Sequence, residues 1–413
     1  MNYQILLADE PITNDEWPIL DYGLHHDSRH LYIPNAGLLD KTDISPQKFA
    51  IIREKIPYLF SFPTTDAYRF PFDIFSAVFY LATEYEKWAD PVFDSHGRYK
   101  ETAYESYKQK WYTYPLVHLY AEHLWEFIQA QFPRLERSHR HFTVQFTFDI
   151  DHPWKFLQKP LSLQIGGMGK DLLKGNLPQI QERLGTWISR KDPNQCFEII
   201  IKHFPPEWTH FFFLIARNSP YDGRFTHTHR AYVELIRTIA AKGFSTGIHP
   251  SYTSYLDSSR IERETQHLQG ILKYPTSHSR QHFLRYRHPE TFQFLLQAGI
   301  KAEYSLVNYE TGGFRTGIAL PYPWFDLSTN QETSLMLHPT HLMDVTLPQY
   351  LALEPEAGIA YAMKWVEATQ QVGGEFVLLM HNDTLSNSGM WKGWREAWLG
   401  FVGEVMGRVV GSR

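Results

Sequence analysis

Two aspartates, Asp149 and Asp151, follow an apolar stretch of the chain and are the first candidates for chemistry. Residues two positions apart in an extended chain point to the same side, so the two carboxylates lie close together. Their mutual repulsion is relieved if they are solvated or if a cation or a proton lies between them. An isolated Asp-x-Asp pair is more typical of a solvated turn that leaves a strand, so the pair needs support from elsewhere in the chain.

Further ionisable residues stand at comparable places along the chain. His249 follows Gly247-Ile248, His381 follows an apolar run, and Arg280 and His282 precede a predicted helix and strand. In parallel α/β architectures, sites form at the carboxyl edge of the sheet, so these residues are expected to converge with the two aspartates. Carboxylates, imidazoles and a guanidinium together suit a divalent metal of the zinc or cobalt kind, with a base and an acid beside it.

The elements that must position these residues follow from hydrophobic periodicity. Val144, Phe146 and Phe148 alternate with polar residues, which predicts a strand with two different faces. From residue 141 onward, predicted strands alternate with predicted helices, which indicates a parallel sheet or barrel. The strands are expected at 142–148, 209–216, 244–248, 300–307 and 375–380, and the helices at 232–242, 290–298, 359–371 and 391–410. The glycine-rich segment Gly166–Lys170 is expected to form a flexible turn.

Residues 1–138 are predicted to form a smaller N-terminal α/β domain, and residues 139–413 a second domain. The boundary is placed in a polar segment around Pro133. Within the first domain, a strand is expected at 3–8 and helices from Ser45-Pro46, at 73–88 and at 115–132. No catalytic residue is predicted in this domain, and Asp94 and His96 are expected to be solvated in a turn-rich loop.

Composition limits the function classes. The 413 residues carry a net charge of -5 and no basic run, so nucleic-acid binding has no electrostatic support. The single cysteine, Cys196, excludes an intramolecular disulfide and a cysteine-rich zinc site. The N-terminus lacks the features of a signal peptide, and no apolar run has the length of a membrane span. The sequence therefore predicts a soluble, cytoplasmic protein, and it does not predict the oligomeric state.

The order of these motifs resembles the polysaccharide deacetylases, the carbohydrate esterase family with the NodB homology domain. The resemblance covers residues 141 to about 390 and rests on Thr147-Phe148-Asp149-x-Asp151, Phe211-Phe212-Phe213-Leu214, Gly247-Ile248-His249, Arg280-x-His282 and Leu379-Met380-His381. The stretch 68–81 with Glu84-Tyr85-Glu86 is similar to the bacterial subgroup that carries an additional N-terminal α/β domain. The resemblance implies a distorted (β/α) barrel and metal-dependent removal of an N-acetyl group from an N-acetylated sugar or polysaccharide.

The resemblance also implies roles for individual residues. Asp149 matches the general base, and Arg280 matches the arginine that fixes and polarises that base. Asp151 and His249 match metal ligands. His381 matches the general acid that protonates the leaving amine, and the apolar residue two positions before it, Leu379, matches a residue that lines the acetyl pocket.

One position departs from the family pattern, because Thr253 stands where a second metal histidine is usual. His282 is the candidate for the missing ligand; weaker candidates are His278, His227 and His229. Tyr252 and Trp324 are assigned to the substrate pocket, and Asp326 is a candidate support for Arg280. A packed tryptophan and a capping aspartate are equally consistent with the last two.

The expected cofactor is therefore a divalent metal, zinc in the first place, with cobalt or nickel as alternatives. The expected partner is an N-acetylated saccharide substrate. Two other functions stay open from the sequence. One is a different metal-dependent hydrolase of C–N amide bonds on the same barrel. The other is a catalytically inactive relative that binds saccharide through its aromatic residues, which the missing second histidine favours.

Overall fold

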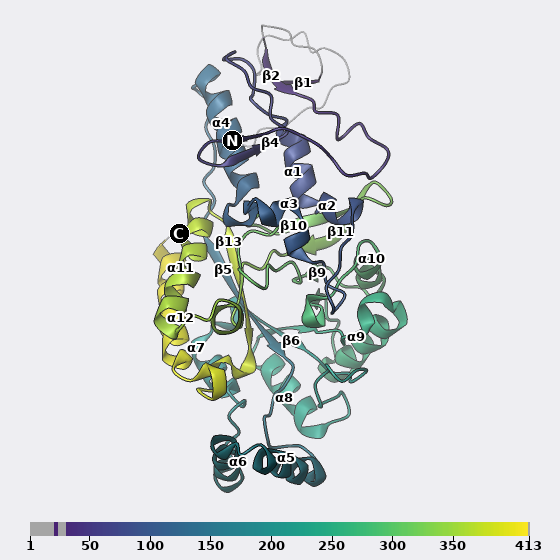
Figure 1. Ribbon diagram of the computed structural model, residues 1–413, viewed down its shortest axis with the longest axis vertical. Coiled ribbons are helices and arrows are strands. Elements are labelled where there is room, and N and C mark those ends of the chain that lie inside the picture. Colours follow the sequence, from purple (N-terminus) through teal and green to yellow (C-terminus); the bar gives the residue numbers. More distant parts are fainter. Residues whose placement is uncertain (1–19, 24–29, 412–413) are drawn as a thin grey trace.

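The computed structural model describes residues 20–23 and 30–411, and Figure 1 shows an α/β barrel with a smaller N-terminal part above it. A nine-stranded sheet has the order β10-β11-β9-β8-β7-β6-β5-β13-β12. Its central strands are parallel and comprise β5 (Thr143–Ile150), β6 (Thr209–Phe213), β7 (Ser245–Ile248), β8 (His278–Ser279), β9 (Ala302–Glu303) and β13 (Glu375–His381). Within residues 30–411, no helix combines the length and hydrophobicity needed to cross a bilayer.

The sheet closes into a distorted barrel through one continuous segment. β11 (Gln331–Leu337) pairs in parallel with β9, and further along the same segment β12 (Leu342–Met343) pairs in parallel with β13. A parallel bridge between Val307 and Thr340 lies between these two pairings. An antiparallel strand, β10 (Tyr322–Asp326), is added outside β11. The predicted α/β barrel is confirmed, and its closure point lies beside β13.

Helices cover the outside of the barrel, and the main hydrophobic core lies between them and the sheet. They are α7 (Phe197–His203), α8 (Arg230–Ala241), α9 (Ser258–Leu272), α10 (Glu290–Gln297), α11 (Pro355–Gln371) and α12 (Trp394–Gly411). Phe146, Phe148 and Ile150 of β5 are buried in the cluster that these helices form with the sheet. Because side chains alternate along a strand, Asp149 points to the other face, into the barrel. The predicted helices and strands of this region are confirmed, with β6 and β9 shorter than expected.

The N-terminal part has its own hydrophobic cluster, which includes Phe70, Phe72 and Tyr120. Its elements are β1 (Leu20–Gly23), β2 (Leu31–Pro34), β3 (Ile51–Arg53), β4 (Pro57–Leu59), α1 (Ile74–Ala82), α2 (Tyr85–Ala89), α3 (Glu105–Lys108) and α4 (Leu116–Gln131). The helix expected from Ser45-Pro46 is wrong: β3 and β4 form an antiparallel hairpin there, because the β-branched Ile51 and Ile52 suit a strand. The strand expected at 3–8 lies outside the described residues.

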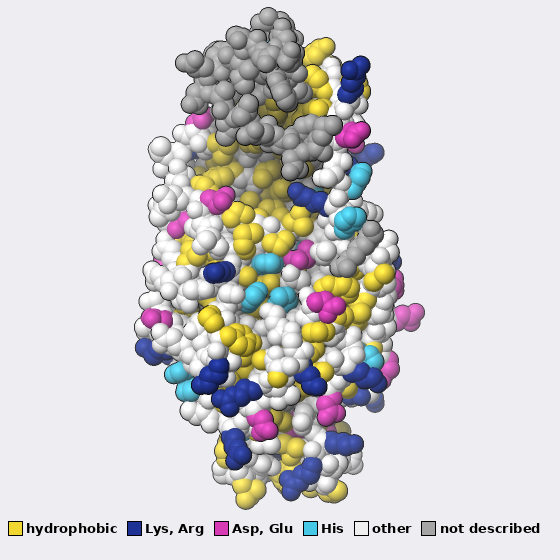
Figure 2. Space-filling view, turned by 180° about the vertical axis from the view of Figure 1, so that it is seen from behind, with side chains coloured by type: hydrophobic (Ala, Val, Ile, Leu, Met, Phe, Trp, Pro, Cys, Tyr) yellow, Lys and Arg dark blue, Asp and Glu magenta, His cyan; other side chains and the backbone are white. Residues whose placement is uncertain are grey.

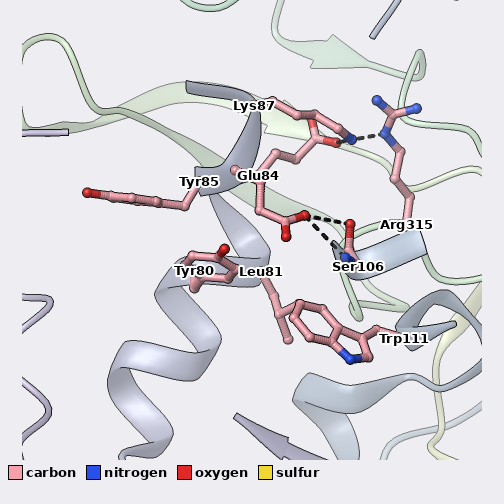
Figure 3. Close-up of a pocket in the computed structure, with 9 residues that line it drawn as sticks. Tyr80, Leu81, Glu84, Tyr85, Lys87, Ser106, Trp111 and Arg315 are labelled. Atoms are coloured by element: carbon pink, nitrogen blue, oxygen red, sulfur yellow. Dashed lines mark hydrogen bonds and ion pairs between the residues drawn. The ribbon is translucent and has the colours of Figure 1, made fainter. Parts of the chain in front are cut away.

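A buried ion network joins the N-terminal part to the barrel (Figure 3). Arg315 donates from Nε to Glu84 at 2.7 Å and lies 2.8 Å from Glu101 through Nη2. Lys87 also pairs with both carboxylates. Burial alone would raise the pKa of Glu84, but the charges of Arg315 and Lys87 hold it well below its usual value. The interface therefore contains two carboxyl groups and two basic side chains, whose formal charges balance one another.

A helical hairpin is inserted between β5 and β6 and projects from the lower end of the molecule in Figure 1. It consists of α5 (Leu161–Leu173) and α6 (Leu177–Ser189). The flexible turn expected at Gly166–Lys170 is wrong, because α5 continues through it. Gly167 lies at the helix crossing, where an added Cβ would approach the Arg183 guanidinium to 2.8 Å. The glycine thus leaves room for the guanidinium group of Arg183 against α5.

Candidate metal centre

The carboxyl ends of the parallel strands bring the predicted site residues together. Asp149 lies opposite His381 in the register of β5 and β13. His249 directly follows β7, and its backbone N–H donates to Phe213 at the end of β6. Figure 2 shows imidazole groups gathered near the middle of one face, among hydrophobic side chains. The convergence expected at the carboxyl edge of the sheet is therefore present.

Asp151, His249 and His282 form a triad that has the composition of a metal site. One ligand atom from each lies within 4.8 Å of the other two. Nε2 of His249 is 3.2 Å from Oδ1 of Asp151, and Nε2 of His282 is 3.6 Å from Oδ2. Oδ1 of Asp151 is buried and has no hydrogen-bond partner among the described residues. Two imidazole nitrogens and a carboxylate are a donor set that zinc accepts.

The hydrogen bonds behind each imidazole determine which nitrogen faces the triad. Nδ1 of His249 lies 2.5 Å from the carbonyl oxygen of Arg280, and a carbonyl can only accept. Nδ1 therefore carries a proton, and Nε2 is the nitrogen that faces Asp151 and could hold a metal. Nδ1 of His282 faces Oδ1 of Asp222 at 3.2 Å in the same way. Such outer partners orient metal ligands, and three acceptors facing one another require a cation or protons between them.

Asp222 is held as a carboxylate by its own partners. Burial alone would raise its pKa, but hydrogen bonds from His282 and from the backbone N–H groups of Tyr252 and Asn218 lower it. Those N–H groups donate at 2.7 Å and 2.9 Å. The loop that carries Asp222 also packs against the backbone of the triad, since a Cβ added to Gly223 would clash with the carbonyl oxygen of Asp151. Glycine is therefore needed at this position.

Arg280 is fully buried and holds Asp149 in place. Its Nη1 donates to Oδ1 of Asp149 at 2.9 Å, while Nε and Nη2 donate to Tyr304 and Thr340. The second carboxylate oxygen, Oδ2, lies 3.7 Å from Nε2 of His249 and so faces the triad. Arg280 thus positions two groups: its side chain holds Asp149, and its backbone carbonyl holds His249.

His381 also lies next to the triad, with Nε2 3.9 Å from Oδ2 of Asp151. Its Nδ1 is 2.9 Å from Oδ1 of the buried Asp344. Burial alone would lower the pKa of His381, but Asp344, together with Asp151 and Asp149, raises it to about 10. The imidazole is therefore a cation at neutral pH and has a proton to donate.

The remaining predicted residues lie in three different surroundings. Leu379 is buried in a small apolar cluster with Leu284, Val307, Tyr309 and Met343. Trp324 packs against Phe292 and His288 beneath α10, and none of its ring contacts involves a triad residue. Asp326 accepts hydrogen bonds from Gln293 and Ser328 rather than from Arg280.

The weaker candidates for the metal ligand lie away from the triad. His278 packs on Tyr304, and His227 packs on His267. His229 is hydrogen-bonded to the backbone carbonyl of Gln158.

An aromatic rim adjoins the triad. Tyr221 and Tyr252 have ring centroids 4.4 Å apart, and Phe283 lies 5.1 Å from Tyr252 and 4.9 Å from His282. The expectation that His96 is solvated is wrong, because its Nδ1 lies 3.0 Å from the Tyr252 hydroxyl. The 94–98 loop of the N-terminal part thus completes the rim; Arg98 of this loop stacks on Tyr309 at 3.9 Å.

Asp222 and Asp344 are two residues of the centre that the sequence did not predict. Asp344 follows Leu342-Met343, a short apolar pair that ends in an acid, as β5 does. Asp222 lies in Pro220-Tyr221-Asp222-Gly223, a composition typical of a solvated turn. Asp344 could therefore have been predicted from the sequence. Asp222 could not, because its neighbours have the composition of an ordinary solvated turn.

Residues 1–133 match a family described as "Family of unknown function (DUF7033)". No curated protein matches the chain. Similar solved structures include a polysaccharide deacetylase from Bacillus cereus (11% identity, TM-score 0.33, 63% of this chain and 87% of that chain). They also include an allantoinase (12% identity, TM-score 0.42, 66% of this chain and 88% of that chain). A third is a CE4-family pseudoenzyme from Bacillus anthracis (10% identity, TM-score 0.34, 67% of this chain and 66% of that chain). At these levels of similarity, the side-chain geometry is what bears on function.

Proposed function

We propose that the chain is a metal-dependent hydrolase that removes an N-acetyl group from an N-acetylated saccharide. The observation that carries the proposal is the meeting of three acceptor atoms at Asp151, His249 and His282, flanked by an arginine-held Asp149 and a protonated His381. A carboxylate base and an imidazolium acid beside a metal triad are the groups that amide hydrolysis needs.

Asp151, His249 and His282 would hold the ion, and zinc fits the two nitrogen donors and one oxygen donor. When bound, such an ion polarises an amide carbonyl and lowers the pKa of water. Asp149 takes the proton of the attacking water through Oδ2, since Oδ1 is occupied by Arg280. His381 gives its proton from Nε2 to the departing nitrogen, while Asp344 stabilises the imidazolium through Nδ1. Acetate and a free amine result.

The rim supports a saccharide as the substrate. Tyr221 is 49% exposed and packs against Tyr252 with an angle of 32° between the ring planes. An exposed aromatic ring near the triad suits the apolar face of a sugar ring. The apolar cluster around Leu379 is a candidate for the surroundings of the acetyl methyl group. The motif resemblance in the sequence points to the same substrate class.

The position of His282 bears on the inactive alternative. That alternative rests on Thr253 in place of a second histidine, and His282 supplies an imidazole at the triad from a different loop. Phe283 and Leu284, the next two residues, have left-handed φ angles of 60° and 57°. Backbone strain of this kind is concentrated at functional sites, which supports an active centre.

The test is acetate release by the zinc-loaded chain from N-acetylated oligosaccharides, beside a panel of cyclic and small amides. We expect release from the saccharides that is lost on chelation, restored by zinc, and lost in Asp149→Asn. Asp257→Asn is a matched control, because Asp257 caps a helix away from the triad. The proposal fails if the protein purifies without zinc, cobalt or nickel and wild type and Asp149→Asn are equally inactive. Cleavage of the other amides alone would favour the second hydrolase function.

A further inference from the structure

The α5–α6 hairpin exposes an unusual amount of apolar surface. Its leucine and isoleucine side chains are exposed on both helices, with Leu173 at 92% and Ile188 at 85%. The other exposed ones are Leu161, Leu163, Ile165, Leu172, Leu177 and Leu184. No residue of α5 is buried. Apolar patches of this kind on a folded protein usually mark a surface that meets another phase or partner.

The hairpin is nevertheless anchored to the barrel and internally paired. Lys155 bonds to Glu182 at 2.6 Å and also to Ser388. Arg183 bonds to Asp171 at 2.6 Å and joins α6 to α5. The two acidic residues of the hairpin, Asp171 and Glu182, are thus both occupied by internal cations.

The exposed charges of the hairpin are consequently all basic. Lys170, Lys174, Arg190 and Lys191 are exposed, and no acidic side chain between residues 160 and 191 is. Figure 2 shows hydrophobic and basic side chains together at the lower end of the molecule, where Figure 1 places α5 and α6. Helices that combine exposed leucines with lysine and arginine lie in the interface of anionic membranes.

We propose that the α5–α6 hairpin docks on the surface of an anionic phospholipid bilayer. A second copy of the chain is the less favourable occupant, because a two-fold contact would bring the same basic patch against itself. The insertion follows β5 in the chain, so docking would tether the barrel to the bilayer through the segment that follows Asp149 and Asp151. This inference does not depend on the proposed function, since vesicle binding needs neither metal nor substrate.

The test is co-sedimentation of the full chain with phosphatidylcholine vesicles, with and without phosphatidylglycerol. We expect binding that requires phosphatidylglycerol and weakens with salt. The double variant Lys170→Gln, Lys174→Gln should lower the vesicle–water partition coefficient by about 25-fold, because each basic residue near the surface contributes about fivefold. Leu173→Ser with Ile188→Ser should lower it by at least about tenfold. Val410→Ser is the matched control, because Val410 is 69% exposed on α12 and should leave binding unchanged.

Several results would overturn the proposal. Absence of binding, or equal binding to neutral and anionic vesicles, would contradict the electrostatic argument. A loss in Val410→Ser as large as that in the hairpin variants would show that any exposed apolar residue suffices. Concentration-dependent dimers that disappear in the Leu173→Ser and Ile188→Ser variant, without vesicle binding, would assign the surface to a second copy. Two variants of different chemistry keep the test independent of the folding of either one.

Discussion

Replacing Asp222 by asparagine should weaken zinc binding although Asp222 is not itself a candidate ligand. Its carboxylate accepts three donors: the backbone N–H groups of Tyr252 and Asn218, and Nδ1 of His282. An asparagine has one acceptor oxygen and one donor group. If the oxygen keeps the His282 bond, the NH2 group faces the Asn218 N–H. If the amide turns over, the NH2 group faces Nδ1 of His282 and favours the tautomer whose Nε2 carries a proton.

Either arrangement has a cost that can be bounded. One buried donor without a partner costs about 1–3 kcal/mol, and loss of an outer partner typically lowers metal affinity about 10–100-fold. We therefore expect the zinc dissociation constant of Asp222→Asn to rise by about 10–100-fold. His282→Ala, which removes the ligand atom itself, should have a larger effect than Asp222→Asn.

A second effect of the substitution has the opposite sign. Burial alone would lower the pKa of His282, but the charges of Asp151 and Asp222 raise it to about 9. At about neutral pH, the imidazole of His282 in the metal-free chain therefore carries a proton on both nitrogens. Zinc must displace the proton on Nε2 in order to bind there. Loss of the Asp222 charge lowers this pKa and eases the displacement. The proton on His282 competes with zinc less strongly as the pH rises towards the pKa of His282. The loss of zinc affinity in Asp222→Asn should therefore be larger at mildly alkaline pH than at mildly acidic pH.

The assay is calorimetric titration of zinc into the chelator-treated chain, at two pH values. Asp257→Asn is the control, because Asp257 also accepts a backbone N–H, from Arg260, but lies at a partly exposed helix cap. Wild-type affinity in Asp222→Asn, with weak binding in His282→Ala, would refute the orientation by Asp222. Wild-type affinity in both variants would refute His282 as a ligand.

Three further predictions concern the base, the acid and the buried network. Asp149→Asn should lower kcat on the N-acetylated substrate by about 10²–10⁴-fold while zinc affinity is retained, as single-turnover assays and titration would show. Asp344→Asn should move the alkaline limb of the pH–rate profile to lower pH, because the pKa of His381, raised to about 10, loses its largest raising contribution. Arg315→Met should lower the free energy of unfolding in urea by roughly 3–5 kcal/mol, since it leaves two buried carboxylates, one of them Glu84, with one cation.

Each of these predictions has a control or a contradicting result. Unchanged kcat in Asp149→Asn would assign the base to another group. An unmoved alkaline limb in Asp344→Asn would show that another group limits the rate at high pH. For the network, Arg408→Met removes an arginine that pairs with exposed glutamates, and should cost less than about 1 kcal/mol. Equal losses in Arg408→Met and Arg315→Met would contradict the role of burial.

The sequence predicted the parts of the site that lie at strand ends, because strand period and apolar runs are local signals. Asp149, Asp151, His249 and His381 were predicted in this way, and the structure brings them close together. His282 was only a candidate ligand, since its reach depends on the left-handed turn at the next two residues, which has no local signature. The structure places it at the triad.

Contacts between distant segments were not predictable from local patterns. The 94–98 loop has the composition of a solvated turn, and nothing local indicates that His96 meets Tyr252, 156 residues later. The glycines of α5 indicated a turn for a similar reason. Their helical state is favoured by the crossing with Arg183 on α6, a tertiary contact that overrides propensity.

The ion network between the two parts has a consequence for the order in which the chain is synthesised. Glu84 leaves the ribosome well before Arg315, its hydrogen-bond partner across 231 positions. In the interval, Lys87 is the one basic side chain among the described residues of the N-terminal part that pairs with Glu84 and Glu101. Burying both carboxylates around one cation is unfavourable. The first-made part of the chain therefore reaches its final packing only after the barrel segment that carries Arg315 has been translated.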